Sequence, residues 1–271
     1  MNRIDQTFAR LKAEGKSAFV AYITAGDPSP EHTPALVRTL VEAGADIIEL
    51  GLPFSDPLAD GAVNQAAAGR ALDAGTTTVK VLEIVRQIRT FSQVPLVLFT
   101  YLNPVYSYGF TRFHTDAAEA GADGVLLLDL PPDEACRNEE LSAIKVAASG
   151  LLHIQLIAPT SPPERVTMIA EMAEGFIYYV SREGVTGAQS SLSAGIREHV
   201  EEIKASAKGV PVAVGFGIST PEQARTVAGL ADGVVVGSAI VKIIATHGTG
   251  PALLHRVLEC VKPLVEAVKS A

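Results

Sequence analysis

Short runs of apolar residues recur along the whole chain, and this regular recurrence restricts the fold more than any other feature of the sequence. The runs are nearly continuously apolar instead of alternating with polar residues, as expected for parallel strands that are buried on both faces. Segments of helical length, such as Val79–Thr90 and Glu134–Ala148, separate them. Eight strands that alternate with helices close most readily into a (β/α)8, or TIM, barrel. The eight predicted strands are Phe19–Thr24, Ile47–Leu50, Leu96–Tyr101, Val125–Leu128, Leu152–Ile157, Phe176–Val180, Val212–Val214 and Val234–Val236.

A single barrel domain is expected to span residues 1–271, because barrels of this kind need about 250 residues. Ile4–Glu14 predicts an extra amphipathic helix before the first strand, and this helix would close the bottom of the barrel. Three similar tripeptides, each placed just before a predicted strand, indicate repeated strand–helix units. They are Gly44-Ala45-Asp46, Gly121-Ala122-Asp123 and Leu230-Ala231-Asp232.

The charge balance and the N-terminal sequence argue against several classes of protein. With 22 Lys and Arg against 30 Asp and Glu, the net charge is −8, which disfavours a protein that binds nucleic acid through basic residues. Charged residues interrupt Met1–Gly15, so this segment lacks the apolar core of a signal peptide. The sequence contains no run of about 18 or more apolar residues, the length that a membrane-spanning helix needs. We therefore expect a cytoplasmic protein.

Metal and Schiff-base chemistry are also disfavoured by the sequence. The two cysteines, Cys136 and Cys260, form no CxxC pair, and the six histidines show neither HxH nor HExxH spacing. All nine lysines fall in predicted helices or beside them, so no strand ends in a catalytic amine. We expect no metal site, and the remaining chemistry is acid–base catalysis.

Glycines at the ends of the last two strands predict a phosphate site. The seventh strand runs into Gly215-Phe216-Gly217-Ile218-Ser219, and the eighth into Gly237-Ser238 at a helix start. Glycines let backbone N–H groups approach an oxyanion closely, and a helix N-terminus adds partial positive charge. The alternative is that these glycines only form tight turns. Gly187, in the long loop after the sixth strand, favours the phosphate site.

Two carboxylates follow the second strand. Glu49 interrupts an apolar strand near its carboxyl end, where burial would raise its pKa toward neutrality. The alternative for Glu49 is a hydrogen-bonding role in a neighbouring loop. Asp60 lies in the long loop that follows, where Asp60-Gly61 by itself would indicate an ordinary turn. Together the two residues predict a two-carboxylate site at the barrel mouth.

Several other polar residues lie near predicted strand ends, and each of them by itself favours a hydrogen bond in the core over a functional role. Tyr178 is the strongest functional candidate, because it precedes the glycine-bearing loop after the sixth strand. The remaining residues of this kind are Tyr22, Thr100, Tyr101, Asp129 and Gln155.

These motifs closely resemble those of the tryptophan synthase alpha chain family, and the resemblance covers essentially the whole chain. The stretch from Glu49 to Gly61 is its most specific part. The resemblance implies a lyase that cleaves indole-3-glycerol phosphate into indole and glyceraldehyde 3-phosphate by a retro-aldol reaction. The segments that carry it are Ala25-Gly26-Asp27-Pro28, Glu49-Leu50-Gly51-Leu52-Pro53-Phe54-Ser55-Asp56-Pro57 with Asp60-Gly61, Ser181-Arg182-Glu183-Gly184-Val185-Thr186-Gly187, and Gly215-Phe216-Gly217-Ile218-Ser219.

The resemblance also implies a role for each matching residue. Glu49 would be the general acid and base, and Asp60 would contact the indole N–H group. Tyr178 would be the active-site tyrosine, and Thr186 a loop residue that helps to close the site. Tyr22 stands where the family often has phenylalanine. The implied phosphate cradle consists of Gly187, Gly217, Gly237 and Ser238.

A partner chain is implied as well. In the family, a pyridoxal-phosphate-dependent beta chain receives the indole and joins it to serine, in an alpha2-beta2 assembly. Pro53, Phe54 and Asp56 lie on the loop that matches part of this interface, and an exposed phenylalanine between prolines would suit a partner surface. The cofactor would belong to the beta chain, so this chain is expected to bind none.

Two other functions stay open at this point. Another phosphate-binding barrel enzyme, such as a phosphosugar isomerase, would share the glycines of the last two strands. A subunit without catalytic activity could bind ligand and regulate a partner. The presence of both carboxylates argues against each alternative.

Overall fold

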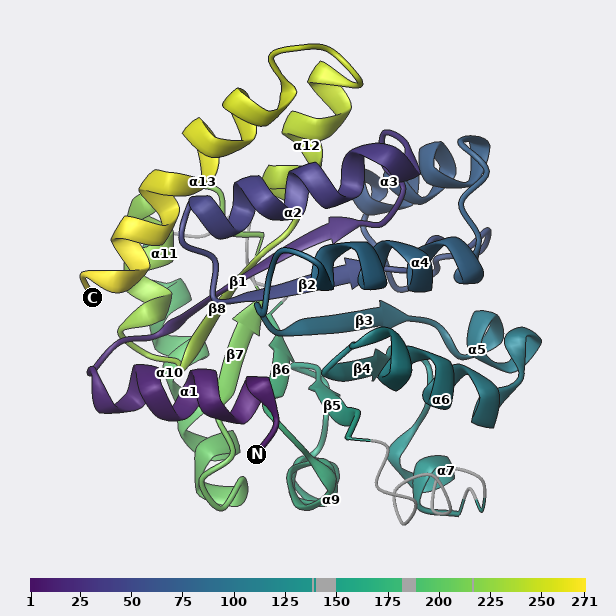
Figure 1. Ribbon diagram of the computed structural model, residues 1–271. Helices are drawn as coiled ribbons and strands as arrows, with labels where there is room; N and C mark the ends of the chain where they lie inside the picture. Colours follow the sequence, from purple (N-terminus) through teal and green to yellow (C-terminus); the bar gives the residue numbers. More distant parts are fainter. Residues whose placement is uncertain (138, 140–149, 182–188, 216) are drawn as a thin grey trace.

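The computed structural model describes residues 1–137, 139, 150–181, 189–215 and 217–271. Eight parallel strands form a closed barrel in the order β1 to β8, with helices around it (Figure 1). The predicted TIM barrel is therefore confirmed. The strands are β1 Ala18–Thr24, β2 Ile47–Gly51, β3 Leu96–Thr100, β4 Gly124–Leu127, β5 Leu152–Ile157, β6 Ile177–Val180, β7 Val212–Gly215 and β8 Gly233–Val236.

The observed strands differ from the predicted ones by at most one residue at each end, and glycines explain part of the difference. The apolar runs predicted β4 and β8 from Val125 and Val234, because glycine is a poor strand former. Both strands begin one residue earlier, where the ladder pairs Gly124 with Val97 and Gly233 with Ala213. A Cβ atom on Gly124 would lie 3.0 Å from Ile4 Cδ1. Glycine is thus suited to this strand because the N-terminal helix presses against it.

The helices cover the outside of the barrel, and the predicted helix Val79–Thr90 is observed one residue earlier. Of the predicted helix Glu134–Ala148 the structure describes only the beginning, because residues 138 and 140–149 lie outside the described ranges. The described helices are α1 Arg3–Ala13, η1 Pro30–His32, α2 Thr33–Glu42, α3 Ala62–Asp73, α4 Thr78–Arg89, α5 Leu102–Tyr108, α6 Phe110–Ala120, α7 Pro132–Arg137, α9 Pro163–Met172, α10 Gln189–Ser206, α11 Pro221–Ala228, α12 Ser238–His247 and α13 Leu253–Lys269.

Helix α1 closes the amino-terminal end of the barrel, as the sequence predicted. Asn2 caps it by accepting a hydrogen bond from the Ile4 N–H group. Ile4, Phe8 and Leu11 have the spacing of one helical face, and all three are buried against apolar residues of the barrel interior. The opposite, carboxyl-terminal end of the barrel is left for a binding site.

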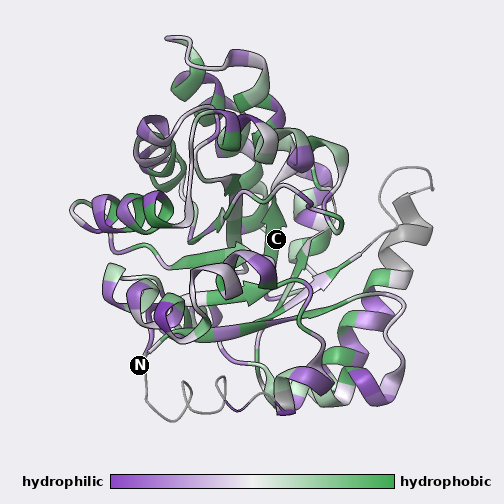
Figure 2. Cartoon of the chain, turned by 90° about the vertical axis from the view of Figure 1, so that its right-hand side faces the viewer, coloured by the Kyte–Doolittle hydropathy of each residue, from purple (hydrophilic) through white to green (hydrophobic). Residues whose placement is uncertain are grey.

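A larger apolar layer lies between the strands and the surrounding helices. In Figure 2 the strands are mostly hydrophobic, whereas the helices carry hydrophilic stripes toward solvent. This layer includes Phe19, Leu36, Val85 and Ile240, each fully buried. Burial on both faces explains why the strand sequences are continuously apolar.

At the amino-terminal end of the barrel, acidic side chains form hydrogen bonds between neighbouring strands. The carboxylate just before an even-numbered strand accepts the backbone N–H near the start of the preceding odd-numbered strand. The bonds run from Phe19 to Asp46 (2.7 Å), from Leu96 to Asp123 (2.8 Å), from His153 to Glu174 (2.8 Å) and from Val212 to Asp232 (2.8 Å). Three of these acids belong to the tripeptides noted in the sequence. This hydrogen bond therefore recurs once in each successive pair of strands.

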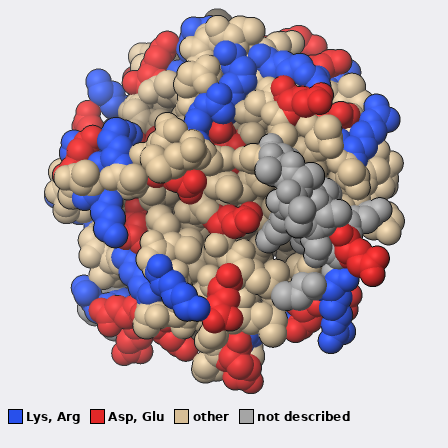
Figure 3. Space-filling model, turned by 60° about the horizontal axis from the view of Figure 1, so that its bottom comes forward, with Lys and Arg blue, Asp and Glu red and all other residues tan. Residues whose placement is uncertain are grey.

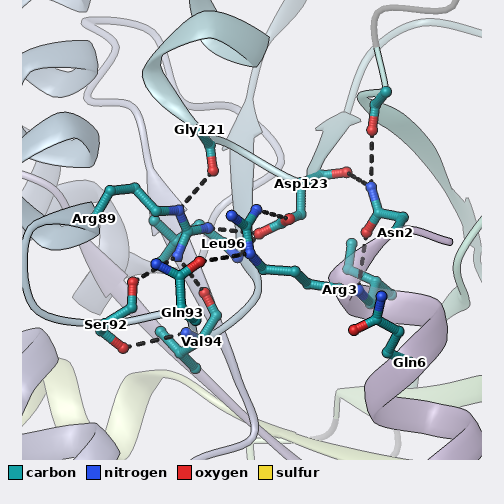
Figure 4. A network of polar contacts seen from close by, with 12 residues as sticks. Asn2, Arg3, Gln6, Arg89, Ser92, Gln93, Val94, Leu96, Gly121 and Asp123 are labelled. Atoms are coloured by element: carbon teal, nitrogen blue, oxygen red, sulfur yellow. Dashed lines mark hydrogen bonds and ion pairs between the residues drawn. The ribbon is translucent and has the colours of Figure 1, made fainter.

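The carboxylate of Asp123 is the centre of the largest of these networks (Figure 4). Besides the Leu96 N–H group, it accepts hydrogen bonds from Arg3 at 2.8 Å and from Arg89 at 2.6 Å. The side-chain amide of Asn2 donates to the Asp123 backbone carbonyl at 2.9 Å. This network fastens the beginning of α1 to strands β3 and β4.

The distribution of charged side chains on the surface agrees with the net negative charge of the chain. On the face shown in Figure 3, Lys and Arg side chains are interspersed with Asp and Glu, and the described part of that face has no continuous basic area. Among the described helices, none is long and apolar enough to cross a membrane.

Candidate active site

A cavity of about 580 Å³ opens at the carboxyl ends of the strands. Its volume lies within the usual range for small-molecule sites. The cavity brings together residues from six strands and from the loops that follow them. Its lining includes Tyr22, Asp60, Val63, Asn64, Phe99, Leu128, Leu156, Tyr178, Ser181, Gly217, Gly237 and Ser238.

One part of the cavity is aromatic and apolar. The rings of Tyr22 and Phe99 pack edge to face, with 5.2 Å between centroids, and Phe99 lies 6.2 Å from the ring of Tyr178. Leu128 and Leu156 add aliphatic surface. A flat aromatic ligand would find complementary contacts here.

The two tyrosine rings fit into the barrel because neighbouring strands carry glycine. A Cβ atom on Gly51 would lie 2.3 Å from the Tyr22 hydroxyl, and one on Gly215 would lie 2.3 Å from the Tyr178 hydroxyl. Burial raises the pKa of both phenols well above the ordinary value. Both hydroxyls therefore stay protonated in the physiological pH range.

Glu49 faces the barrel interior and pairs in register with Tyr22, which lines the cavity. Ile47, two residues earlier on β2, belongs to the interior cluster, and residues two apart on a strand share one face. The Glu49 carboxyl is fully buried, and neither oxygen has a hydrogen-bond partner among the described residues. Burial raises its pKa to about 8. Glu49 therefore holds a proton at neutral pH, as its place in the sequence indicated.

Asp60 lies at the cavity wall, on the loop of residues 52–61 between β2 and α3, which we call the β2–α3 loop. Its Oδ2 accepts a hydrogen bond from the Tyr101 hydroxyl at 2.9 Å, and its Oδ1 accepts one from the Asn64 amide at 3.4 Å. Burial raises the pKa of Asp60, and these two hydrogen bonds oppose the rise. The structure thus gives the two carboxyl groups different surroundings: within the described part of the chain, Glu49 has no hydrogen bond and Asp60 has two donors.

The other part of the cavity offers backbone groups suited to an anion. Gly217 has a φ of 65°, a left-handed conformation that favours glycine, and Ser238 is the first residue of α12. Gly237 has a second role, because a Cβ atom there would lie 3.2 Å from the Tyr22 ring. The candidates Thr186 and Gly187 lie outside the described residues.

The candidate partner residues lie in the first half of the β2–α3 loop. Asp56 is exposed, and Pro53 borders an open groove of about 420 Å³. Phe54, expected to be exposed, is half-buried because its ring packs on that of Tyr101, with 5.4 Å between centroids. The strongly exposed apolar residue of this loop is Leu58, which is 90% exposed.

Sequence reasoning missed several residues of the cavity. Phe99, Leu128 and Leu156 read as ordinary core residues, and only their position at the open end of the barrel distinguishes them. Asn64 follows Asp60 by one helical turn, a spacing that could have paired them. For Tyr101 the sequence favoured a hydrogen bond in the core over a functional role, whereas its hydroxyl donates to the Asp60 carboxylate. Among the described residues no group of three His, Cys, Asp or Glu side chains could hold a metal ion.

The fold and the cavity define an enzyme of the TIM-barrel class, with a buried, protonated carboxyl in the barrel interior and an aromatic cavity at the carboxyl ends of the strands. The family model described as "Tryptophan synthase alpha chain" matches residues 8–269. This chain belongs to the tryptophan synthase alpha chain family.

Individual relatives agree with this assignment along nearly the full length. The tryptophan synthase alpha chain of Geobacter sulfurreducens is 51% identical over 270 residues, which cover 99% of each chain. That of Opitutus terrae is 51% identical over 251 residues, 93% of this chain and 92% of the relative. The crystal structure of tryptophan synthase subunit alpha from Legionella pneumophila has a TM-score of 0.88 at 42% identity, covering 99% of this chain and 98% of that one.

Proposed function

We propose that Glu49 and Asp60 carry out the reaction of this family in the cavity described above. As a member of the family, the chain is a carbon–carbon lyase of tryptophan biosynthesis, which cleaves indole-3-glycerol phosphate into indole and glyceraldehyde 3-phosphate. The observation that carries the residue assignment is the buried Glu49 carboxyl, which lacks a hydrogen-bond partner among the described residues and has its pKa raised to about 8.

The raised pKa lets one carboxyl group act first as an acid and then as a base. Protonated Glu49 gives its proton to the indole carbon that bears the glycerol chain, and the ring becomes a cationic indolenine. The Glu49 carboxylate then takes the proton of the adjacent hydroxyl group. The carbon–carbon bond breaks, its electron pair returns to the ring, and the hydroxyl carbon becomes the aldehyde. Glu49 ends protonated, ready for another cycle.

Asp60 would stabilise the cation that forms between these two steps. A carboxylate beside the ring N–H group lowers the energy of the positively charged indolenine. The hydrogen bonds from Tyr101 and Asn64 favour the ionised form that this role needs. The different surroundings of the two carboxyl groups thus match their different tasks.

Substrate would lie with its ring against the aromatic residues and its phosphate at the glycine-rich end. Tyr22, Phe99 and Tyr178 would contact the indole, while Gly217, Gly237 and Ser238 would offer backbone or hydroxyl groups to the phosphate. We propose that Gly187 and Thr186 complete the phosphate cradle and the closure of the site. Because the Glu49 carboxyl has no exposed surface, we propose that its side chain turns toward the bound substrate.

We further propose that a beta chain docks on the β2–α3 loop through Pro53, Phe54 and Asp56, in an alpha2-beta2 assembly. Exposed Leu58 would add apolar contact area. Pyridoxal phosphate would belong to the beta chain, where it would support the joining of indole to serine. The described lysines of this chain lie on helices or within three residues after a helix end, and none of them lines the cavity.

The test compares Glu49→Gln with the wild-type chain on indole-3-glycerol phosphate, alone and with a beta chain. We expect near-complete loss of indole release in the variant, because glutamine cannot transfer the proton. Glu83→Gln, the same change at an exposed position of α4, is the control and should keep wild-type activity. Unchanged indole release by Glu49→Gln would refute the assignment. Absence of release by the wild-type chain in both conditions would favour a catalytically idle subunit.

A further inference from the structure

Tyr101 contacts two regions of the β2–α3 loop, one at Phe54 and one at Ala59 and Asp60. It follows β3 directly and is 5% exposed. Its ring packs on Phe54 with 5.4 Å between centroids and an angle of 40°. Its hydroxyl accepts a hydrogen bond from the Ala59 N–H group at 2.9 Å and donates one to Asp60 Oδ2 at 2.9 Å. One side chain therefore contacts both the proposed partner surface and a proposed catalytic carboxylate.

The direction of the second hydrogen bond follows from the first. A backbone N–H group can only donate, so the Tyr101 oxygen accepts from Ala59 and its single proton is free for Asp60. Oδ2 of Asp60 is thereby engaged, and the longer contact of 3.4 Å from Asn64 leaves Oδ1 as the oxygen more available to a ligand. The hydrogen bond from Tyr101 thus distinguishes the two oxygens of Asp60.

Few other bonds restrain this segment. Among the described residues, the hydrogen bonds of residues 53–60 stay within the loop or reach Asn64 and Gln65 in the first turn of α3, apart from the two to Tyr101. Within the part of the chain that the structure describes, Tyr101 therefore makes the polar contacts that connect residues 53–60 to the barrel strands. A displacement of Phe54 would press on the Tyr101 ring and alter the geometry at Asp60.

We propose that Tyr101 is a positioning residue that orients the Asp60 carboxylate and makes this orientation depend on how Phe54 is seated. This inference rests on the function proposed above for Asp60 and for the β2–α3 loop. It adds a physical route by which a partner bound at Phe54 changes the chemistry in the cavity. The route is short, since it needs one ring contact and one hydrogen bond.

Tyr101→Phe tests the hydrogen bond, because it removes the hydroxyl and keeps the ring on Phe54. We expect kcat/KM of the isolated chain to fall about tenfold, the usual effect of losing a hydrogen bond to a charged group. The acid limb of the pH profile should move to higher pH, because Asp60 loses a donor that favours its ionised form. The position of this limb does not depend on how much of the protein is folded.

The other titratable groups near Asp60 leave this readout clear. Burial, and to a smaller extent the Asp60 charge, raise the pKa values of Tyr22, Tyr101 and Tyr178, so all three stay neutral across the range measured, from about pH 5 to about pH 9. Glu49 titrates on the alkaline side of this range. Tyr106→Phe, which removes a phenol hydroxyl from a residue that is 65% exposed, is the matched control and should leave both kcat/KM and the profile unchanged.

The coupling itself is tested by combining Tyr101→Phe with Phe54→Leu. We expect Phe54→Leu to shift the acid limb in the wild-type background and to have no further effect on it in the Tyr101→Phe background. Additive shifts would overturn the coupling, and an unshifted acid limb in Tyr101→Phe would overturn the positioning role. Asp60→Asn separates these outcomes from the proposed function, since an active Asp60→Asn chain would refute the role of Asp60 itself.

Discussion

Asp123→Ala should destabilise the protein far more than removal of an ion pair at the surface. Asp123 is 3% exposed and Arg89 11% exposed, so the change leaves a buried guanidinium without its carboxylate (Figure 4). Breaking a buried pair in this way costs about 3–5 kcal/mol. The same change also removes the acceptor of the Leu96 N–H group, whereas Arg3, 38% exposed, keeps contact with water. We therefore expect a loss of at least about 3 kcal/mol in the free energy of unfolding.

A matched control separates burial from the ion pair as such. Asp133 forms an ion pair of 2.7 Å with Arg165, but both side chains are 45% exposed. Asp133→Ala should therefore cost less than about 1 kcal/mol. Urea unfolding followed by circular dichroism, with and without added salt, measures both variants. High salt should reduce the effect of Asp133→Ala and leave that of Asp123→Ala nearly unchanged. Equal destabilisation by the two variants would refute the argument from burial.

Two further predictions concern the cavity. Glu49→Gln should become more stable than the wild-type chain as the pH rises from about 4.5 to about 8, because in this window the unfolded wild-type chain loses a proton that the folded state keeps. The gain should approach about 5 kcal/mol and level off above pH 8 in urea titrations at several pH values, and a constant difference between the two chains would contradict it. Gly215→Ala should destabilise by about 1–3 kcal/mol and raise KM, because the new methyl group would lie 2.3 Å from the Tyr178 hydroxyl and displace that ring. Gly229→Ala is the control, because its methyl group would lie 3.6 Å from its nearest neighbour, and it should change neither the stability nor KM. Equal shifts in melting temperature for the two variants would contradict the predicted clash at Tyr178.

The barrel and the two carboxylates could be recognised in the sequence because the relevant physics is local. A strand buried on both faces needs apolar residues at successive positions, so its place is encoded in a few adjacent residues. Glu49 was identifiable since a carboxylate inside such a run is costly without a function. Asp46, Asp123 and Asp232 could be recognised because each ends one of the three similar tripeptides and directly precedes its strand. Glu174 could not, because it precedes its strand by three residues instead of one.

The surroundings of these residues depended on contacts between distant parts of the chain. Only closure of the barrel shows that Glu49 is buried without a hydrogen-bond partner among the described residues, and that glycine at 215 makes room for Tyr178. Tyr101 and Asp60 are 41 positions apart, and no pattern along the chain links them. The sequence by itself therefore determined the fold and the chemical groups at the strand ends, because burial and strand position are local properties. The tertiary structure alone decided which group is desolvated and which is held by donors, because both depend on neighbours from other strands.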